Sequence, residues 1–298
     1  MAVETGQQTL LRDHPDDHAS WLAYGELLTE QGDARGELIQ LERRHARTRP
    51  ADRAALRRDI DALVAEHQER WDAELPQGVS VLARRYGFAT RVEVEWSEDA
   101  PALIERALRE SFVTALRIAP GTTSEEDDDY DEDEFEGEDP EFPPVEAGAL
   151  AGLDLSQLAE LDLSYLRIGG PGAQALAASA MTGRMHTLDL RYCSLDDVGL
   201  AALSAAPGLA DLRRLHLQGN SLTAEGMRSL HRFERLVELD LRYNSIGEAG
   251  VDALLAAPFM GSLELLRLYR ADVSAAGAKK LARDSRIPAT QRSYWRNV

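Results

Sequence analysis

Cysteine is almost absent from this sequence, which has Cys193 alone among 298 residues. A single thiol can form neither an intramolecular disulfide nor a cysteine metal cluster. Long apolar runs are missing too, since no stretch approaches the roughly 20 residues that span a bilayer. Residues 1–20 lack the basic start and apolar run of a secretory signal. We therefore expect a cytoplasmic protein without a membrane partner.

Sequence motifs for catalysis and cofactor binding are also missing. The chain contains no G-x-S-x-G, P-loop, C-x-x-C or H-E-x-x-H pattern. His14 and His18 lie four residues apart among aspartates, which suggests a metal site. The start of a helix favours the same polar residues, and we prefer that interpretation. We expect no enzyme, no cofactor, and no catalytic or metal-binding residues.

Negative charge is concentrated in one segment. The formal net charge is −19, and residues 125–141 hold 13 acidic side chains and no basic one. The rest of the chain carries 39 acidic against 33 basic residues. A nucleic-acid-binding protein needs a basic surplus, because neutralising phosphates supplies most of its affinity. We therefore expect no nucleic-acid partner.

A repeated leucine pattern dominates the second half of the chain. The pattern L-x-x-L-x-L-x-x-N/C-x-L opens at Leu158, Met185, Leu212, Leu236 and Leu263, at spacings of 27, 27, 24 and 27. Its alternating leucines predict a short strand with one buried face, and the apolar residues four apart that follow predict a helix. A glycine recurs in each predicted helix, where elements must approach closely: Gly172, Gly199, Gly226, Gly250 and Gly277. Each strand–helix unit buries its leucines only when the next unit stacks on it.

This spacing resembles the ribonuclease-inhibitor class of leucine-rich repeats, over roughly residues 150–284. The resemblance implies an α/β fold, a right-handed solenoid with a parallel inner sheet and outer helices. It also implies that the concave strand face recognises another protein. The identity of that protein does not follow from the resemblance.

The N-terminal part has a helical pattern. We predict helices from Asp16 or Asp17 to Gln31, over residues 37–47 and over residues 51–71. Residues 14–42 resemble the bacterial repeat-companion domain, a short helical module found beside repeat arrays. The resemblance is carried by Leu22, Tyr24, Leu27, Gly32, Asp33, Arg35, Gly36 and Glu37. Among these, we expect Asp33, Arg35 and Glu37 to hold the turn between two helices by hydrogen bonds and an ion pair.

The patterns together divide the chain into five parts. Residues 1–77 form the helical repeat-companion domain, and 78–120 form divergent capping repeats with strands near Val92 and Leu116. We expect residues 121–146 to form an acidic, disordered insert, because dense carboxylates repel one another and bury no core. Residues 147–284 form the leucine-rich repeats, and 285–298 a C-terminal cap.

Three roles are open for the acidic insert. It can be a solvated loop, or it can dock a basic partner through Tyr130, Phe135 and Phe142. Calcium binding by the alternating Asp129, Asp131 and Asp133 is the third, although the glycine and glutamate of an EF-hand are misplaced. The insert could also fold back on an arginine-rich helical region: Arg43, Arg44, Arg47, Arg49, Arg53, Arg57 and Arg58.

Tyrosine and arginine gather where the predicted strands face the concave side. The predicted partner-binding residues are Asp162, Tyr165, Asp189, Arg191, Tyr192, His216, Gln218, Asp240, Arg242, Tyr243, Arg267 and Tyr269. Tyrosine and arginine are enriched at binding hot spots. Tyr192 and Tyr243 should stand about 10 Å apart, with Gly219 leaving a gap between them. The alternative is a self-neutralising sheet, with Asp189 and Asp240 paired to the nearby arginines.

The function predicted from these patterns is an interaction scaffold or adaptor. The alternative is a regulatory subunit that inhibits or activates an enzyme held in the horseshoe. If the concave face binds, Tyr192→Ala or Arg242→Ala should abolish capture of the partner, with thermal melting nearly unchanged.

Overall fold

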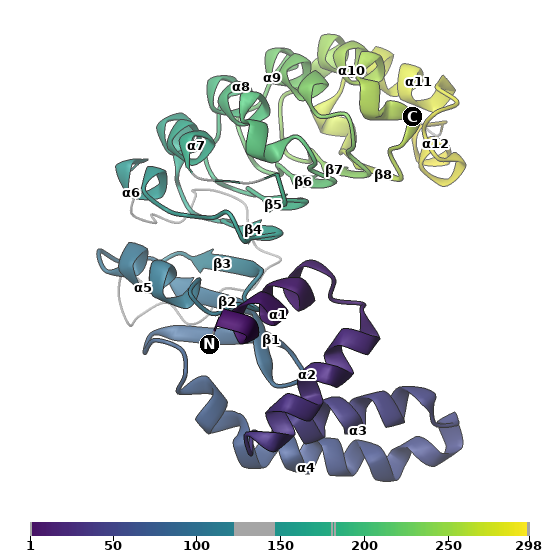
Figure 1. The fold of residues 1–298 in the computed structure, drawn as a ribbon. Helices are drawn as coiled ribbons and strands as arrows, with labels where there is room; N and C mark the ends of the chain where they lie inside the picture. The colour runs from purple at the N-terminus through teal and green to yellow at the C-terminus, as the bar shows by residue number, and fades with distance from the viewer. Residues whose placement is uncertain (1, 122–146, 180, 182, 297–298) are drawn as a thin grey trace, which may run out of the picture. The chain divides into compact units, whose positions relative to one another are not determined.

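The computed structural model describes residues 2–121, 147–179, 181 and 183–296 (Figure 1). The chain forms two compact units, one of residues 1–94 and 102–115, the other of residues 95–101 and 116–298. The predicted calcium, docking and disorder roles of the acidic insert lie outside the described residues. Among the described helices, none is long and apolar enough to cross a membrane.

The chain begins with helices and continues into a hairpin. The first elements are α1 (Ala2–Asp13), α2 (His18–Glu30), α3 (Arg35–Arg47), a 3-10 turn (Pro50–Asp52), α4 (Arg53–Asp72), β1 (Val79–Arg85), β2 (Phe88–Glu95), α5 (Ala100–Ala107) and β3 (Ala115–Ala119). The three helices predicted between Asp16 and residue 71 are confirmed as α2, α3 and α4. Helix α1 extends the helical part further toward the N-terminus than the pattern suggested.

The limits of α2 follow from its end residues. The Asp17 carboxylate caps the helix, accepting hydrogen bonds from the backbone N–H groups of Ala19 and Ser20 at 3.1 and 3.2 Å. Gly32 adopts a φ of +75°, which ends the helix at little steric cost. Helix α3 crosses α2 so closely that a Cβ on Gly36 would meet the carbonyl oxygen of Gly25.

Strand β1 was not predicted. It pairs antiparallel with β2, and a bulge between Val81 and Ala83 interrupts the alternation that would have marked it as a strand. Tyr86 and Gly87 form the connecting turn with φ values of 51° and 83°, the left-handed pair that suits a two-residue hairpin. The predicted domain boundaries at residues 77 and 120 stay predictions.

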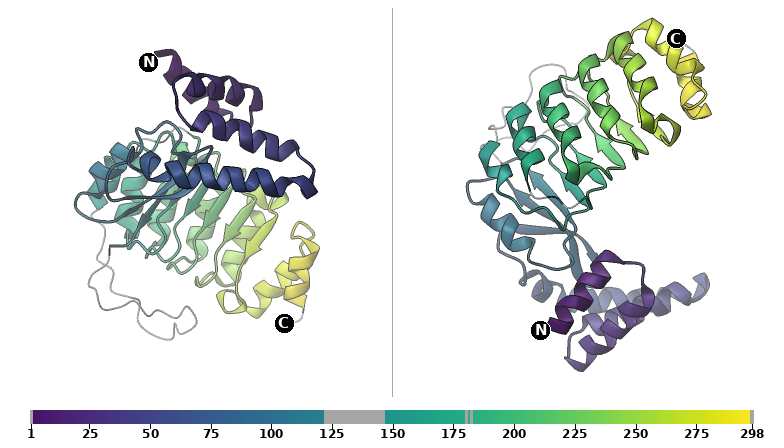
Figure 2. Two further views of the ribbon diagram at one scale, coloured as in Figure 1. Left: turned by 90° about the horizontal axis from the view of Figure 1, so that it is seen from below. Right: turned by 45° about the horizontal axis from the view of Figure 1, so that its top comes forward.

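The repeats form the rest of the second unit. Its elements are α6 (Ala147–Ala151), β4 (Glu160–Asp162), α7 (Gly169–Ala178), β5 (Thr187–Asp189), α8 (Asp197–Ala205), β6 (Arg214–His216), α9 (Ala224–Ser229), β7 (Glu238–Asp240), α10 (Gly247–Ala256), β8 (Leu265–Arg267), α11 (Ala275–Arg283) and α12 (Ala289–Arg296), with 3-10 turns at Pro207–Leu209, Leu230–Arg232, Pro258–Gly261 and Arg270–Asp272. Strands β4 to β8 pair in parallel in chain order. The helices lie along one side of this sheet (Figures 1 and 2). The predicted mixed α/β fold with a parallel sheet is confirmed.

The leucines of successive repeats stand in register. Leu161 pairs with Leu188, Leu188 with Leu215, and the column continues through Leu239 to Leu266. All five side chains are buried between the sheet and the helices. The burial of each apolar side chain contributes about 1.5–3 kcal/mol, so this column of leucines stabilises the stacking of the repeats.

The recurring glycines permit the helices to pack closely, as their position predicted. A Cβ on Gly199 would lie 3.0 Å from the Cα of Gly170 and 3.1 Å from the Cβ of Ala173, both in α7. A Cβ on Gly226 would meet the carboxylate of Asp197 in α8. A larger side chain at these positions would push neighbouring repeats apart.

Asn220 and Asn244 bind the backbone of the turns that follow the strands. The side-chain oxygen of Asn220 accepts hydrogen bonds from Cys193 N and Leu195 N at 3.2 and 2.8 Å. Its amide nitrogen donates to Leu190 O and Leu217 O at 2.8 and 3.0 Å. Asn244 repeats the same arrangement one unit later. Buried backbone groups that strands and helices leave unpaired are thereby satisfied.

The last strand is closed by a side chain. Gln291 in α12 accepts a hydrogen bond from Leu266 N at 3.0 Å and donates one to Glu264 O at 2.8 Å. Its amide therefore takes the place of a further strand beside β8, where an open edge would invite pairing with other chains. Trp295 of the same helix is buried and adds apolar cover.

Asn220→Ala should lower the free energy of unfolding by about 3 kcal/mol or more, because each buried backbone group left unpaired costs about 1–3 kcal/mol. The exposed neighbour provides a control, since Ser221→Ala should stay within about 0.5 kcal/mol of the parent. Urea unfolding of both variants measures the difference. Equal losses would contradict the structural role of Asn220.

Candidate functional site

The candidate site is the open face, which we define as the side of strands β4 to β8 turned away from helices α6 to α11. In a strand, alternate residues point to the same side, so residues flanking the buried central leucine share this face. The open face therefore has a first row: Glu160, Thr187, Arg214, Glu238 and Leu265. It has a second row: Asp162, Asp189, His216, Asp240 and Arg267.

The predicted second row is placed in line by the strand register. Sequence reasoning missed the first row, although the two-residue period places those residues on the same face. Its member Glu238 lies near two arginines, with Oε2 3.8 Å from Arg214 Nε and Oε1 3.6 Å from Arg267 Nη2. Each strand therefore presents two residues on the open face.

Two predicted contact residues are mostly buried. Asp189 is only 7% exposed, and Asp240 is only 1% exposed. Arg191 Nε lies 2.9 Å from both carboxylate oxygens of Asp189, and Arg242 Nη2 lies 2.6 Å from Asp240 Oδ2. The self-neutralising pairs considered as an alternative are thus present. Asp189 and Asp240 hold arginines in place and offer little surface to a partner.

His216 joins two acidic neighbours on this face. Its Nδ1 lies 3.2 Å from Asp189 Oδ2, and its Nε2 lies 3.4 Å from Glu238 Oε1. The hydrogen bond with Asp189 raises the pKa of His216 above its ordinary value of 6.5, against the opposing effect of burial. Burial would raise the pKa of Asp189, but hydrogen bonds from His216 and Arg191 outweigh it and lower that pKa.

Four tyrosines form a continuous row beside the strands. The ring centroids of Tyr165 and Tyr192 are 5.1 Å apart and stacked, and those of Tyr192 and Tyr243 are 6.4 Å apart. Tyr243 meets Tyr269 edge to face at 4.7 Å. We call these four residues the tyrosine row.

The gap predicted at Gly219 is wrong. A Cβ built on Gly219 would lie 2.2 Å from the ring of Tyr192, so that ring already covers the glycine. Backbone spacing alone suggested a separation of about 10 Å between Tyr192 and Tyr243, but the rings lean toward each other. Gly219 serves to admit the Tyr192 ring and leaves no pocket for an inserted side chain.

Three members of the tyrosine row have a strained backbone. Tyr165, Tyr192 and Tyr243 adopt φ values of 68°, 54° and 58°, and Gly219 occupies the equivalent position with 67°. The left-handed conformation costs a residue with a Cβ roughly 1–2 kcal/mol, whereas glycine adopts it freely. Tyrosine at such a position therefore costs stability, and strain of this kind points to a functional use of the side chain.

Polar contacts hold the rings in place. Gln218 Nε2 donates to the Tyr192 hydroxyl at 2.8 Å, and Arg242 Nη2 donates to Gln218 Oε1 at 2.9 Å. The Arg242 guanidinium also lies 5.6 Å from the centre of the Tyr269 ring. A hydrogen bond between the hydroxyls raises the pKa of Tyr243 and lowers that of Tyr269. Tyr243 is nevertheless 56% exposed, so an ordered ring faces solvent.

The substitution Arg242→Ala is a poor probe of binding. Removing this guanidinium would leave the buried Asp240 carboxylate without its closest cation, and such losses cost several kcal/mol. We therefore expect Arg242→Ala to lower the melting temperature, in place of the nearly unchanged melting expected from the sequence. Tyr243, the exposed member of the tyrosine row, separates binding from folding better.

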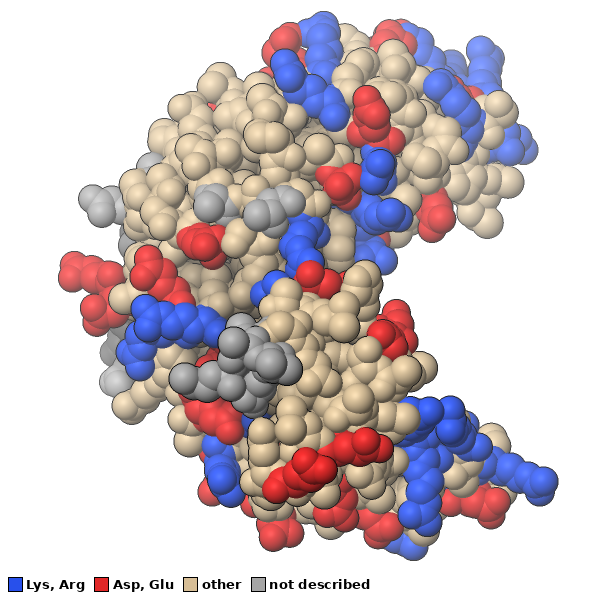
Figure 3. Space-filling model, in the orientation of Figure 1, with Lys and Arg blue, Asp and Glu red and all other residues tan. Residues whose placement is uncertain are grey.

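The open face has no charge of one dominant sign. Figure 3 shows basic and acidic side chains next to one another over the region of β5 to β8. Arg267 approaches Asp240 at 3.8 Å, and Arg117 approaches Asp162 at 3.9 Å. A partner would thus meet aromatic rings among paired charges, which suits a protein surface better than a polyanion.

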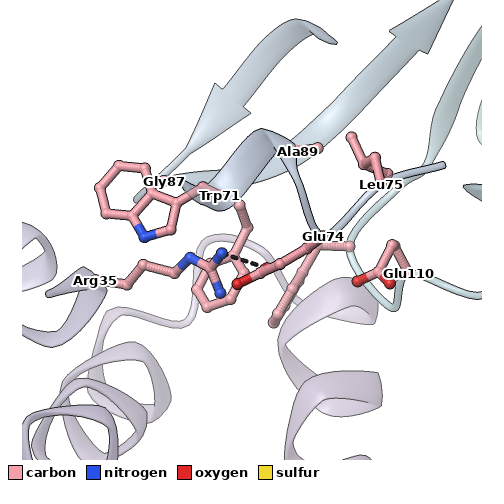
Figure 4. Close-up of a pocket in the computed structure, with 9 residues that line it drawn as sticks. Arg35, Trp71, Glu74, Leu75, Gly87, Ala89 and Glu110 are labelled. Carbon is pink, nitrogen blue, oxygen red and sulfur yellow. Dashed lines mark hydrogen bonds and ion pairs between the residues drawn. The ribbon is translucent and has the colours of Figure 1, made fainter. Parts of the chain in front are cut away.

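A second polar site lies in the first unit (Figure 4). The buried Arg35 donates from its backbone N–H to Asp33 at 2.9 Å and pairs with Glu74, and its guanidinium lies 4.6 Å from the Phe88 ring centre. Burial and the nearby Glu74 charge raise the pKa of Glu110. The cavity measures about 20 Å³, room for roughly one water.

This cavity is too small to hold a substrate between the carboxylates of Glu74 and Glu110, so its geometry does not support a catalytic role for them. The predicted role of Asp33 and Arg35 in the turn before α3 agrees with these contacts, whereas Glu37 is exposed. Within the residues that the structure describes, no three His, Cys, Asp or Glu side chains gather closely enough to hold a metal ion.

Comparison with known families agrees with the geometry of the second unit. A family model described as Leucine Rich repeat matches residues 185–204, 209–230 and 236–255. Residues 185–255 carry leucine-rich repeats. The matches cover the repeats that open at Met185, Leu212 and Leu236, and the repeats opening at Leu158 and Leu263 share their strand register. A search of curated proteins finds no match to the chain.

His216 should make the stability of the leucine-rich repeats depend on pH. The pKa of His216 is raised in the folded chain. Its contribution to the free energy of unfolding is therefore fully present below its unfolded pKa of 6.5 and is lost as the pH rises through its folded pKa. Between about pH 6 and pH 8, the parent should therefore lose more unfolding free energy than His216→Gln. Urea unfolding at several pH values measures both slopes, and identical slopes would contradict the His216–Asp189 contact.

Tyr243→Asn should leave the free energy of unfolding unchanged or raise it by up to about 1 kcal/mol, because asparagine tolerates the left-handed conformation better. Tyr269 is the matched control, since its φ of −91° carries no such strain and Tyr269→Asn should only lose stability. Thermal and urea unfolding compare the two. A large loss in Tyr243→Asn would show that the ring is there for folding.

Proposed function

We propose that this protein is an interaction scaffold or adaptor that binds another protein on the open face of its leucine-rich repeats. The fold proposed with it is a right-handed solenoid of the ribonuclease-inhibitor-like class, in which the open face is concave. Repeat proteins of this kind use such extended surfaces for binding. The single observation that carries the proposal is the tyrosine row, in which three tyrosines adopt a left-handed backbone conformation that costs a residue with a Cβ more than glycine.

The tyrosine row has the physical properties of a binding hot spot. Tyrosine offers large contact area with few rotatable bonds, so little conformational entropy is lost when it is covered. Stacking and the hydrogen bond from Gln218 fix the rings before a partner arrives, which lowers the cost of association further. Exposed Tyr243 lies at the centre of this arrangement.

The predicted binding residues take two proposed roles. Those that touch the partner are Tyr165, Arg191, Tyr192, His216, Gln218, Arg242, Tyr243, Arg267 and Tyr269. Those that support them from below are Asp162, Asp189 and Asp240. Asp189 and Asp240 keep Arg191 and Arg242 oriented, so their substitution would act through the arginines.

Residues 1–77 are proposed to be a bacterial repeat-companion domain. The turn between α2 and α3 supports this, because Gly32, Asp33, Arg35 and Gly36 each have a defined structural task there. Gly32 ends α2, Asp33 binds the backbone of Arg35, and Gly36 allows the two helices to cross.

Tyr243→Asn should reduce retention of the native partner by about tenfold or more, since a central hot-spot residue contributes about 2 kcal/mol or more. Affinity capture from the native cell, followed by mass spectrometry, compares it with the parent. Val198→Asn is the control, because Val198 is 62% exposed on α8, among the helices that cover the other side of the sheet. An unchanged set of proteins with Tyr243→Asn would overturn the proposal. Assaying the captured protein's own activity separates an adaptor from a regulatory subunit.

A further inference from the structure

A second surface suited to a ligand lies in the first unit, between α2 and α3. A hollow of about 260 Å³ opens there, lined by His18, Trp21, Leu22, Ile39, Glu42, Arg43, Ala46, Arg47 and Tyr86. We call it the α2–α3 groove. Its volume falls below the roughly 300–1,000 Å³ typical of sites for drug-sized molecules, so it fits a single large side chain better than a cofactor.

The floor of the groove is apolar and rigid. Trp21 is only 2% exposed, its indole nitrogen donates to Pro15 O at 2.9 Å, and its ring meets Tyr86 edge to face at 4.8 Å. Tyr86 lies in the tight turn of the hairpin with a φ of 51°, and the Arg85 guanidinium lies 5.5 Å from the centre of its ring. Leu22 and Ile39 complete the floor. An apolar side chain entering here would find a preformed site.

The rim of the groove carries more positive than negative charge. Arg43 Nη1 donates to His18 O at 3.2 Å, which holds this guanidinium across the groove. Arg47 is exposed one turn later on α3, and the Arg85 guanidinium lies 5.7 Å from the centre of the Trp21 ring. Glu42 is the one carboxylate among the lining residues, and Arg57 and Arg85 lie near enough to act on its charge. Figure 3 shows basic side chains gathered over the region of α3 and α4.

We propose that the α2–α3 groove binds an acidic peptide segment that inserts one aromatic side chain between α2 and α3. The aromatic ring would cover Leu22 and the edges of Trp21 and Tyr86, while flanking carboxylates would pair with Arg43, Arg47 and Arg85. Aromatic anchors in pockets supply affinity, and complementary charge speeds association and selects the partner. The inference is independent of the function proposed for the open face, because it concerns the other unit.

The chain's own sequence supplies a suitable probe. Residues 124–142, SEEDDDYDEDEFEGEDPEF, combine dense carboxylates with Tyr130, Phe135 and Phe142. A fluorescein-labelled peptide of this sequence, added to the full chain at low salt, should raise its fluorescence anisotropy in a saturable way. A second peptide, with the three aromatic residues replaced by serine, should bind at least about tenfold more weakly, a difference of about 1.4 kcal/mol.

Variants of the protein locate the binding site. Ala46→Glu and Arg47→Glu, both at exposed positions of the groove, should each weaken peptide binding by about tenfold or more. The matched control is Arg58→Glu, an exposed position on α4 outside the groove lining, which should change binding less than about twofold. Circular dichroism of all three checks that the helices remain folded.

The outcomes separate specific from general attraction. Equal effects of Arg47→Glu and Arg58→Glu, or equal binding of both peptides, would overturn the proposal and indicate attraction by net charge alone. The assay is repeated with a chain that lacks residues 124–142. Peptide binding that appears only after this deletion supports the groove and means that the chain's own segment competes for it. No binding to either form of the chain would also overturn the proposal.

Discussion

The rest of the second unit depends on the parallel register of strands β4 to β8. Because the strands pair without an offset, each leucine stacks on the leucine of the next repeat, and each open-face residue stands beside its counterpart. Asn220 and Asn244 secure the same register from the turns, each bonding to the backbone of its own repeat and of the one before. A register shift by one residue would turn the leucines outward and bury the charged rows.

This register also decides which charges are structural and which are available. In-line placement brings His216 next to Asp189, and Arg267 next to Asp240, so the carboxylates are shared among neighbouring strands. Burial makes these carboxylates part of the sheet, since an ion held in low dielectric must keep its partners. The tyrosine row lies where the strands end, beyond the paired charges. The aromatic rings thereby stay accessible while the polar groups below fix their orientation.

Much of the fold could be predicted from spacing alone, because leucine, asparagine and glycine each have one physical task at a fixed place in the repeat. The limits of α2 could be predicted from Asp17 as its cap and Gly32 as its end. Strand β1 could not be predicted, because the bulge at Val81 hides its alternation. The resemblance of residues 14–42 to a repeat-companion domain and the proposed partner surface go beyond what the family match addresses.

The candidate site was harder to predict, since side-chain direction matters more there than spacing. The two-residue period of a strand predicts the second row. The same period places Glu238 and the rest of the first row on the open face, although the sequence prediction did not include them. Gly219 suggested a gap, yet the ring of Tyr192, which follows strand β5 in the preceding repeat, covers it. Asp189 and Asp240 carry the charge expected of contact residues, and only the packing of Arg191 and Arg242 shows that they are buried.

Site-specific photocrosslinking tests the central claim most directly. A photoreactive phenylalanine analogue is placed at Tyr243 on the open face or at Val198, which is 62% exposed on α8 among the helices that cover the other side of the sheet. Illumination in the native cell should crosslink one discrete protein from position 243 and none from position 198. Crosslinks from position 198 with none from position 243 would contradict binding on the tyrosine row.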